Sequence, residues 1–236
     1  MKAMILAAGL GTRLRPLTDD RPKALVEIGG RTLLEICLEY LRGFGVNEVI
    51  VNTHHCAEMV EAYLTANGNF GMRIEISREE TLLDTGGGLK QAAWFFEERG
   101  GDESFLVHNV DVMSSIDLGA MVRFHGERGA LATLAVQERK SSRYLVFDED
   151  GAFCGRETDL VRDCGKTTAL AFAGIHVVSP RIFSKMKETG AFSIIDAYLR
   201  LAGAGENVMA FRADGSAWRD LGRPESVAAA EREMRK

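Results

Sequence analysis

Two cations at a fixed spacing lie in a glycine-containing loop that follows an apolar stretch near the start of the chain. The loop contains Gly9, Gly11 and Arg13 and continues to Lys23. Glycine lets a backbone approach a polyphosphate closely, because it has no Cβ to collide with the ligand and tolerates positive φ. Successive N–H groups in such a loop bind anions, and cations neutralise the bound charge. The segment predicts a nucleoside triphosphate (NTP) site that involves Ala8, Gly9, Gly11, Thr12, Arg13 and Lys23.

Two other phosphate-binding loops do not match this segment. The dinucleotide-binding pattern Gly-x-Gly-x-x-Gly fails because Leu14 stands in place of its third glycine. The P-loop pattern Gly-x4-Gly-Lys-Ser/Thr occurs nowhere in the chain. A glycine-rich turn with surface cations is the remaining alternative.

The same segment resembles the signature of the sugar-1-phosphate nucleotidyltransferases. The matching stretches are Gly-x-Gly-Thr-Arg-Leu from Gly9, Pro-Leu-Thr from Pro16 and Pro-Lys-Ala-Leu-Val from Pro22. The likeness extends, with gaps, over nearly the whole chain. It is strongest to the short single-domain members, the N-acetylmuramate-1-phosphate uridylyltransferases and the mannose-1-phosphate guanylyltransferase-like proteins. It implies an enzyme that joins an NTP to a sugar 1-phosphate.

Two aspartates stand where the family has its magnesium ligands. Asp111 follows an apolar stretch, in Asn-Val-Asp where the family has Asn-Gly-Asp, and ligands of open α/β sheets bind at such strand ends. Asp220 lies in a stretch that resembles the family's Trp-x-Asp-x-Gly-x-Pro. The resemblance implies that both bind Mg²⁺, which prefers oxygen ligands, and that Asn109 contacts the nucleotide. The alternatives are a solvated carboxylate at Asp111 and a helix cap at Asp220.

The expected reaction needs little covalent chemistry from the protein. The sugar phosphate is already an anionic nucleophile, so catalysis is mostly alignment and neutralisation of negative charge. We expect Arg13 to stabilise the departing pyrophosphate, and Lys23 to lie near the α-phosphate and the incoming sugar phosphate.

The base site is expected near residues 79–88. Three consecutive glycines that open a helix permit a flat ring or a phosphate to approach the backbone. We therefore expect Glu79, Thr85 and Gly86 to bind the nucleotide. A carboxylate at Glu79 or Glu80 would accept N–H groups of the base, which favours UTP or GTP over ATP or CTP.

Sugar recognition has the weakest signal. The resemblance places the sugar beside Gly174, with Glu157 on its hydroxyl groups. The lysine that follows this glutamate in the family is missing, because Thr158 stands there, and Lys166 is the candidate substitute. His176 lies on an apolar stretch and is expected in the core.

Strands alternate with helices in the first half of the chain, which predicts βαβ units on a mostly parallel sheet. After Asp111 successive strands predict a mixed sheet. We expect one Rossmann-like α/β domain over 1–236, with helices flanking the sheet, a nucleotide lobe over about 1–115 and a sugar-phosphate lobe over about 116–236. The predicted strands are 3–7, 48–52, 73–77, 104–109, 130–137, 143–147 and 169–178, and the predicted helices are 33–41, 57–66, 87–97, 117–128 and one from near 224.

Composition limits the partners. The net charge of −5 argues against a nucleic-acid-binding face. No apolar run approaches the roughly 20 residues of a membrane span. The apolar stretch at the start of the chain is too short for a signal peptide. The four cysteines have no metal-site spacing, and we expect them to be reduced in a cytoplasmic protein.

Three questions stay open at this point. The nucleotide is UTP or GTP, and the protein is a monomer or a homodimer. The competing functions are a cytidylyl-type transferase that acts on another phosphate ester, and a non-catalytic sensor of nucleotides or sugars on the same fold.

Overall fold

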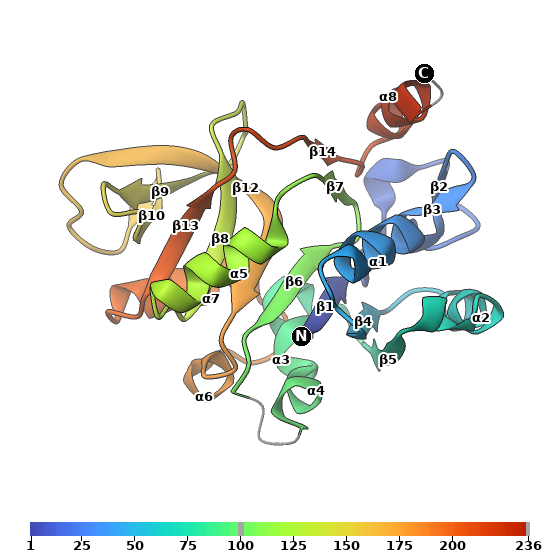
Figure 1. Ribbon diagram of the computed structural model, residues 1–236, viewed down its shortest axis with the longest axis horizontal. Helices are drawn as coiled ribbons and strands as arrows, with labels where there is room; N and C mark the ends of the chain where they lie inside the picture. Colours follow the sequence, from blue (N-terminus) through green and yellow to red (C-terminus); the bar gives the residue numbers. More distant parts are fainter. Residues whose placement is uncertain (99–101, 235–236) are drawn as a thin grey trace.

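The computed structural model describes residues 1–98 and 102–234. A mixed sheet lies at the centre of this part of the chain (Figure 1). Its strands are β1 (Lys2–Leu6), β4 (Glu48–Thr53), β5 (Arg73–Arg78), β6 (Phe105–Asn109), β8 (Ala132–Gln137), β9 (Tyr144–Asp148), β10 (Phe153–Arg156), β11 (Asp159–Leu160), β12 (Thr167–Val178) and β13 (Val208–Arg212). The strand order is β11-β10-β9-β12-β6-β1-β4-β5, with β8 paired to β12 and β13. The predicted α/β class is confirmed.

Helices cover both faces of this sheet. They are α1 (Leu33–Gly43), α2 (Ala57–Ala66), α3 (Asp84–Gln91), α4 (Ala93–Glu97), α5 (Leu118–Glu127), α6 (Ile182–Lys185), α7 (Ile194–Gly203) and α8 (Pro224–Met234). Alternate residues of β1 point to opposite faces. Ile5 packs in the cluster that contains Leu34 of α1, whereas Met4 packs in the cluster that contains Leu89 of α3 and Tyr198 of α7. No described helix has both the length and the apolar character of a membrane span.

One edge of the sheet gathers the carboxyl ends of several strands. β1 pairs in parallel with β4 and β6. β12 runs antiparallel to both β6 and β8, so β8 ends at the same edge as β6. Residues that follow β1, β6 and β8 are therefore brought to one side of the molecule.

Two short strands lie outside the main sheet at this edge. β7 (Val112–Ser114) and β14 (Trp218–Asp220) pair antiparallel and join the middle of the chain to its last part (Figure 1). A second small pair, β2 (Glu27–Ile28) with β3 (Arg31–Thr32), leads into α1. Thr32 caps α1 by accepting a hydrogen bond from the N–H of Glu35 at 3.1 Å.

The single helix predicted over 87–97 is wrong. The structure has α3 and α4 there, with Ala92 between them at φ −83° and ψ 2°. The three glycines at 86–88 have low helix propensity, and tertiary contacts hold them in α3. These contacts are described with the site below.

The expectation of four reduced cysteines is wrong for two of them. Cys154 and Cys164 form a disulfide with 6.2 Å between their Cα atoms. The antiparallel pairing of β10 with β11 turns the chain back, and the N–H of Val161 donates to the carbonyl of Cys154 at 2.9 Å. The ten-residue separation of the two cysteines in the sequence does not by itself predict this turn or the disulfide. Cys37 and Cys56 are free thiols.

Two histidines on neighbouring strands make stability depend on pH. His108 on β6 and His176 on β12 are almost completely buried. Burial lowers the pKa of His108 to about 4 and the pKa of His176 to about 3. Both folded-state pKa values lie below the ordinary 6.5. Below pH 6.5 the unfolded chain therefore binds more protons than the folded protein, and the stability falls as the pH is lowered.

We therefore expect the free energy of unfolding to fall on acidification, by about 1 kcal/mol for each of these histidines between pH 6.5 and about pH 5.5. Urea unfolding at the two pH values measures this loss. A free energy of unfolding that stayed constant over this interval would contradict the expectation.

Candidate active site

The loop after β1 folds around the side chain of Lys23. Gly11 has a φ of +64° and precedes the short 3-10 turn Thr12–Leu14. A Cβ on Gly11 would lie 2.9 Å from the methyl group of Thr18, and a Cβ on Gly9 would lie 3.2 Å from Nζ of Lys23. Gly11 therefore needs glycine, because of its positive φ and this contact, whereas a Cβ on Gly9 would press on the end of the Lys23 side chain.

Four charged side chains meet at Gly222. A Cβ built on Gly222 would lie 2.8 Å from Oδ1 of Asp220 and 3.1 Å from Nη2 of Arg13. The same point is 3.5 Å from Oδ2 of Asp111, which pairs with Nζ of Lys23 at 3.3 Å. Two cations and two carboxylates from distant segments thus share one small region at the carboxyl edge of the sheet.

The β7–β14 pair brings the two aspartates together. Asp220 lies opposite Val112, the residue after Asp111. The N–H of Leu221 donates to the carbonyl of Asp111 at 2.8 Å. The N–H of Gly222 donates to Oδ1 of Asp220 at 2.7 Å, so this carboxylate also fixes the turn before α8. The helix-cap alternative is not what the structure has, because the bond goes to Gly222 before α8 begins, and the second oxygen of the carboxylate remains for a metal ion.

The donor set at this point suits Mg²⁺. Two carboxylates supply hard oxygen ligands, and in protein sites Mg²⁺ usually keeps waters and substrate phosphates as its other ligands. Within residues 1–98 and 102–234 no group of three or more His, Cys, Asp or Glu residues could enclose a metal ion. The site thus fits an ion that is shared with a bound nucleotide rather than one enclosed by protein.

Glu79 lies inside the protein and joins two walls of the site. Its side chain is buried; Oε1 accepts from Nδ2 of Asn52 at 2.7 Å, and Oε2 accepts from the N–H of Leu83 at 2.9 Å. Oδ1 of Asn52 accepts from the N–H of Ala7 at 2.7 Å. Asn52 was not among the predicted site residues, although a polar residue near the end of an apolar strand is a usable signal. This relay links the start of the glycine loop to α3.

The three glycines at the start of α3 are packed by the protein itself. A Cβ on Gly86 would collide with the ring of Phe192, and one on Gly88 would lie 2.6 Å from Oε1 of Glu79. The N–H of Gly86 donates to the carbonyl of Phe192 at 2.9 Å, and Oγ1 of Thr85 accepts from the N–H of Ile194 at 3.0 Å. On the sides of Gly86 and Gly88 where a Cβ would stand, neighbouring protein atoms therefore fill the space that was expected for a ligand.

Gly174 lies against Asn109, at the end of β6. Its φ is +75°, and a Cβ there would lie 2.8 Å from Nδ2 of Asn109. The pairing of β12 with β8 shifts its register between Phe172 and His176. Two of the predicted site residues are thus adjacent, and the space that the glycine leaves is partly taken by the asparagine amide.

Lys166 lies away from the charged cluster, and Glu157 lies in an exposed turn. Glu157 is exposed in the turn between β10 and β11. The Lys166 side chain is 83% exposed and pairs with Glu149 at 3.4 Å. Lys166 precedes β12, and the eight residues from there to Gly174 span roughly 25 Å of extended chain. The structure does not bring this lysine to the four charged residues.

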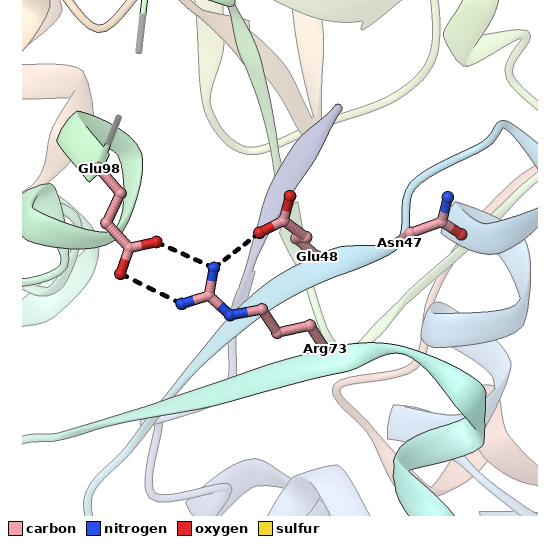
Figure 2. A pocket seen from close by; sticks show the side chains of 4 residues that line it. All are labelled: Asn47, Glu48, Arg73 and Glu98. Carbon is pink, nitrogen blue, oxygen red and sulfur yellow. Dashed lines mark hydrogen bonds and ion pairs between the residues drawn. The ribbon is translucent and has the colours of Figure 1, made fainter. Parts of the chain in front are cut away.

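A polar hollow lies at the opposite edge of the sheet. It has a volume of about 580 Å³ and is lined by Asn47, Glu48, Arg73 and Glu98. Figure 2 shows the guanidinium of Arg73 between the two glutamates. It bonds Glu48 at 2.8 Å and Glu98 at 2.9 Å. Side chains of the protein itself thus supply the acceptors of Arg73. The amino ends of β4 and β5 form this region.

Comparisons with known proteins agree with the fold and the motifs. The family model described as "Nucleotidyl transferase" matches residues 2–236. The N-acetylmuramate alpha-1-phosphate uridylyltransferase of Caulobacter vibrioides is 36% identical over 239 residues, which cover 97% of this chain and 95% of that protein. The mannose-1-phosphate guanylyltransferase catalytic subunit beta of Xenopus tropicalis is 30% identical over 230 residues, which cover 95% of this chain and 62% of that protein.

A solved structure has the same fold. HddC from Yersinia pseudotuberculosis, crystallised with GMP-PN, superposes with a TM-score of 0.80 at 23% identity, and the match covers 99% of each chain.

Proposed function

The chain belongs to the nucleotidyl transferase family, and we propose that it transfers a nucleotidyl group from an NTP to a sugar 1-phosphate in a Mg²⁺-dependent reaction. The products are an NDP-sugar and pyrophosphate. The names of the Caulobacter and Xenopus relatives support this class of reaction. The observation that carries the proposal is the meeting of Arg13, Lys23, Asp111 and Asp220 at Gly222.

The reaction is a displacement at the α-phosphorus of the NTP. An oxygen of the sugar phosphate forms the new bond, and the bond from the α-phosphorus to the bridging oxygen breaks, so pyrophosphate leaves with that electron pair. The nucleophile is already an anion and needs no base, so positioning and charge neutralisation supply the catalysis. Lys23 binds the α-phosphate and the incoming phosphate, and Arg13 stabilises the departing pyrophosphate.

Asp111 and Asp220 are the residues that would hold Mg²⁺. When bound, the ion neutralises phosphate charge and orients the reacting oxygens. Lys23 lies 3.3 Å from Oδ2 of Asp111, so the lysine and the metal ligand are positioned by one another.

The nucleotide lies along the loop formed by Ala8, Gly9, Gly11 and Thr12, with Asn109 beside it. Glu79 holds neighbouring groups in place, because its oxygens already accept hydrogen bonds from the side chain of Asn52 and the N–H of Leu83. Thr85 and Gly86 form the surface on which the base rests. We propose UTP as the nucleotide and GTP as the alternative, because the 36% identical Caulobacter relative, which matches over nearly its whole length, is a uridylyltransferase.

We assign the sugar to the second lobe. Gly174 lies under it and Glu157 reaches it from the β10–β11 turn. The nucleotide lobe is about 1–115 and the sugar-phosphate lobe about 116–236. We place the reaction in the cytoplasm, and a monomer or a homodimer can carry it out because the four charged residues come from one chain.

Release of pyrophosphate from a matrix of substrates tests this function. UTP, GTP, CTP and ATP are each combined with N-acetylmuramate 1-phosphate, glucose 1-phosphate and mannose 1-phosphate, first with Mg²⁺ and then with the ion chelated. We expect release with UTP or GTP and one sugar phosphate, abolished by chelation. Thermal stabilisation by an NTP without any release would instead favour a sensor, and release with CTP alone would favour a cytidylyltransferase.

A further inference from the structure

The phosphate of the acceptor needs a cation on its own side of the site. The stretch after Glu157 lacks the expected lysine, and Lys166 lies at a distant turn beside Glu149. Arg139 is the alternative that the fold brings to the right edge. It follows β8 by two residues, and β8 ends at the same edge of the sheet as β6.

The guanidinium of Arg139 is held on two sides. Its Cζ lies 3.5 Å from the ring centroid of Trp218, and Nη2 donates to the carbonyl of Phe172 at 2.8 Å. Nε1 of Trp218 donates to the carbonyl of Ala173 at 2.8 Å. Both carbonyls belong to the two residues that precede Gly174, in the stretch where β12 shifts its register against β8. The irregular strand thus anchors the arginine and the tryptophan together.

Arg139 lies within electrostatic reach of Asp220. Trp218 and Asp220 are two residues apart on β14, so their side chains share a face and their Cα atoms lie roughly 7 Å apart. Asp220 acts electrostatically on Arg139, and burial lowers the pKa of the guanidinium without removing its charge. Arg219, between them, points to the other face and pairs with Glu233.

The protein does not complete the hydrogen bonding of this guanidinium. Its Nε is buried and has no acceptor within the described part of the chain. A half-buried arginine with an unused donor is unusual, since buried donors are normally paired. Nη1 also has no acceptor within the described residues and is not among the buried atoms, so it is the group that an oxyanion would reach, as guanidinium groups bind phosphate oxygens.

We propose that Arg139, stacked on Trp218, binds the phosphate of the sugar 1-phosphate. This assignment rests on the proposed function. It gives each reacting phosphate its own cation, Lys23 from the nucleotide lobe and Arg139 from the other lobe. The arrangement makes Arg139 a determinant of acceptor binding rather than of nucleotide binding.

Steady-state kinetics of Arg139→Gln and Arg139→Lys test the assignment, with the acceptor that the wild type uses. We expect Arg139→Gln to raise KM for the sugar 1-phosphate at least roughly tenfold, while KM for the NTP changes less than about twofold. Arg139→Lys keeps the charge but loses the planar guanidinium, so its KM for the acceptor should lie between those of the wild type and Arg139→Gln. Lys140→Gln is the matched control, because it removes the adjacent exposed charge.

The outcomes separate the two claims. Equal rises of both KM values, or no change of either, would show that Arg139 only supports the fold of β12 and would overturn the assignment. If Arg139→Gln does not fold, the split between the two KM values in Arg139→Lys decides in the same way. A wild type that releases no pyrophosphate with any acceptor would instead overturn the proposed function itself, and the assignment with it.

Discussion

Lys23→Ala lowers kcat/KM for pyrophosphate release at least roughly 100-fold, which is about 2.7 kcal/mol of transition-state stabilisation. The reason is that two anions must approach each other at the α-phosphorus, and Nζ of Lys23 is the cation that Gly9 admits to this point. The variant also leaves Oδ2 of Asp111 without its partner at 3.3 Å.

A coupled pyrophosphate assay at saturating Mg²⁺ measures this effect. Arg73→Gln is the control, because Arg73 lies at the opposite edge of the sheet in its own network with Glu48 and Glu98 (Figure 2). It should keep its rate and change the stability little, because exposed ion pairs contribute little. A Lys23→Ala enzyme with near-normal turnover would remove the role given to the lysine.

Asp111→Asn lowers the same rate at least roughly 100-fold, again about 2.7 kcal/mol. The substitution keeps the shape of the side chain but removes the negative charge that a hard cation needs. We therefore also expect the Mg²⁺ concentration for half-maximal activity to rise by about tenfold or more, which corresponds to about 1.4 kcal/mol of binding energy. Titration of activity with MgCl₂ measures both quantities.

Asp117→Asn is the matched control for this variant. Asp117 caps α5 by accepting from the N–H of Ala120 at 2.9 Å, and asparagine serves as well in that position. Its activity and its Mg²⁺ requirement should stay within about twofold of the wild type. An Asp111→Asn enzyme with an unchanged Mg²⁺ titration would show that the ion is held elsewhere.

Local patterns were enough to predict the parallel half of the fold. The predicted helix over 57–66 coincides with α2, and the strand predicted over 48–52 differs from β4 by one residue. Apolar periodicity and turn residues specify such elements within a short window. The stretch from Ser193 to Asp196 also predicts a capped helix start, and the side chain of Ser193 accepts from the N–H of Ile195 at 3.3 Å at the start of α7.

The pairing that builds the site had no local signal. β7 and β14 have three residues each and lie about a hundred positions apart, so neither shows a period of its own. The Asn-x-Asp and Trp-x-Asp motifs were recognised through the family resemblance, whereas their meeting at Gly222 is a property of the fold. The disulfide of Cys154 with Cys164 was missed for the same reason, because it depends on the turn between β10 and β11.

Two side chains near the site have partners that a single sequence does not reveal. Glu79 was expected to read the base, but Asn52 and Leu83 occupy its oxygens. Arg139 had no motif of its own, and only its stacking on Trp218 marks it as part of the site. Burial and hydrogen-bond partners of single polar residues depend on distant segments, and a single sequence does not specify them.

The metal position tests the central claim most directly. Crystals grown with Mn²⁺ and a non-hydrolysable NTP analogue would show the ion by its anomalous scattering. The account predicts an ion coordinated by carboxylate oxygens of Asp111 and Asp220 and by phosphate oxygens, with Nζ of Lys23 in contact with the α-phosphate. An ion bound away from this pair, or a nucleotide whose phosphates lie far from the loop between Gly9 and Arg13, would contradict it.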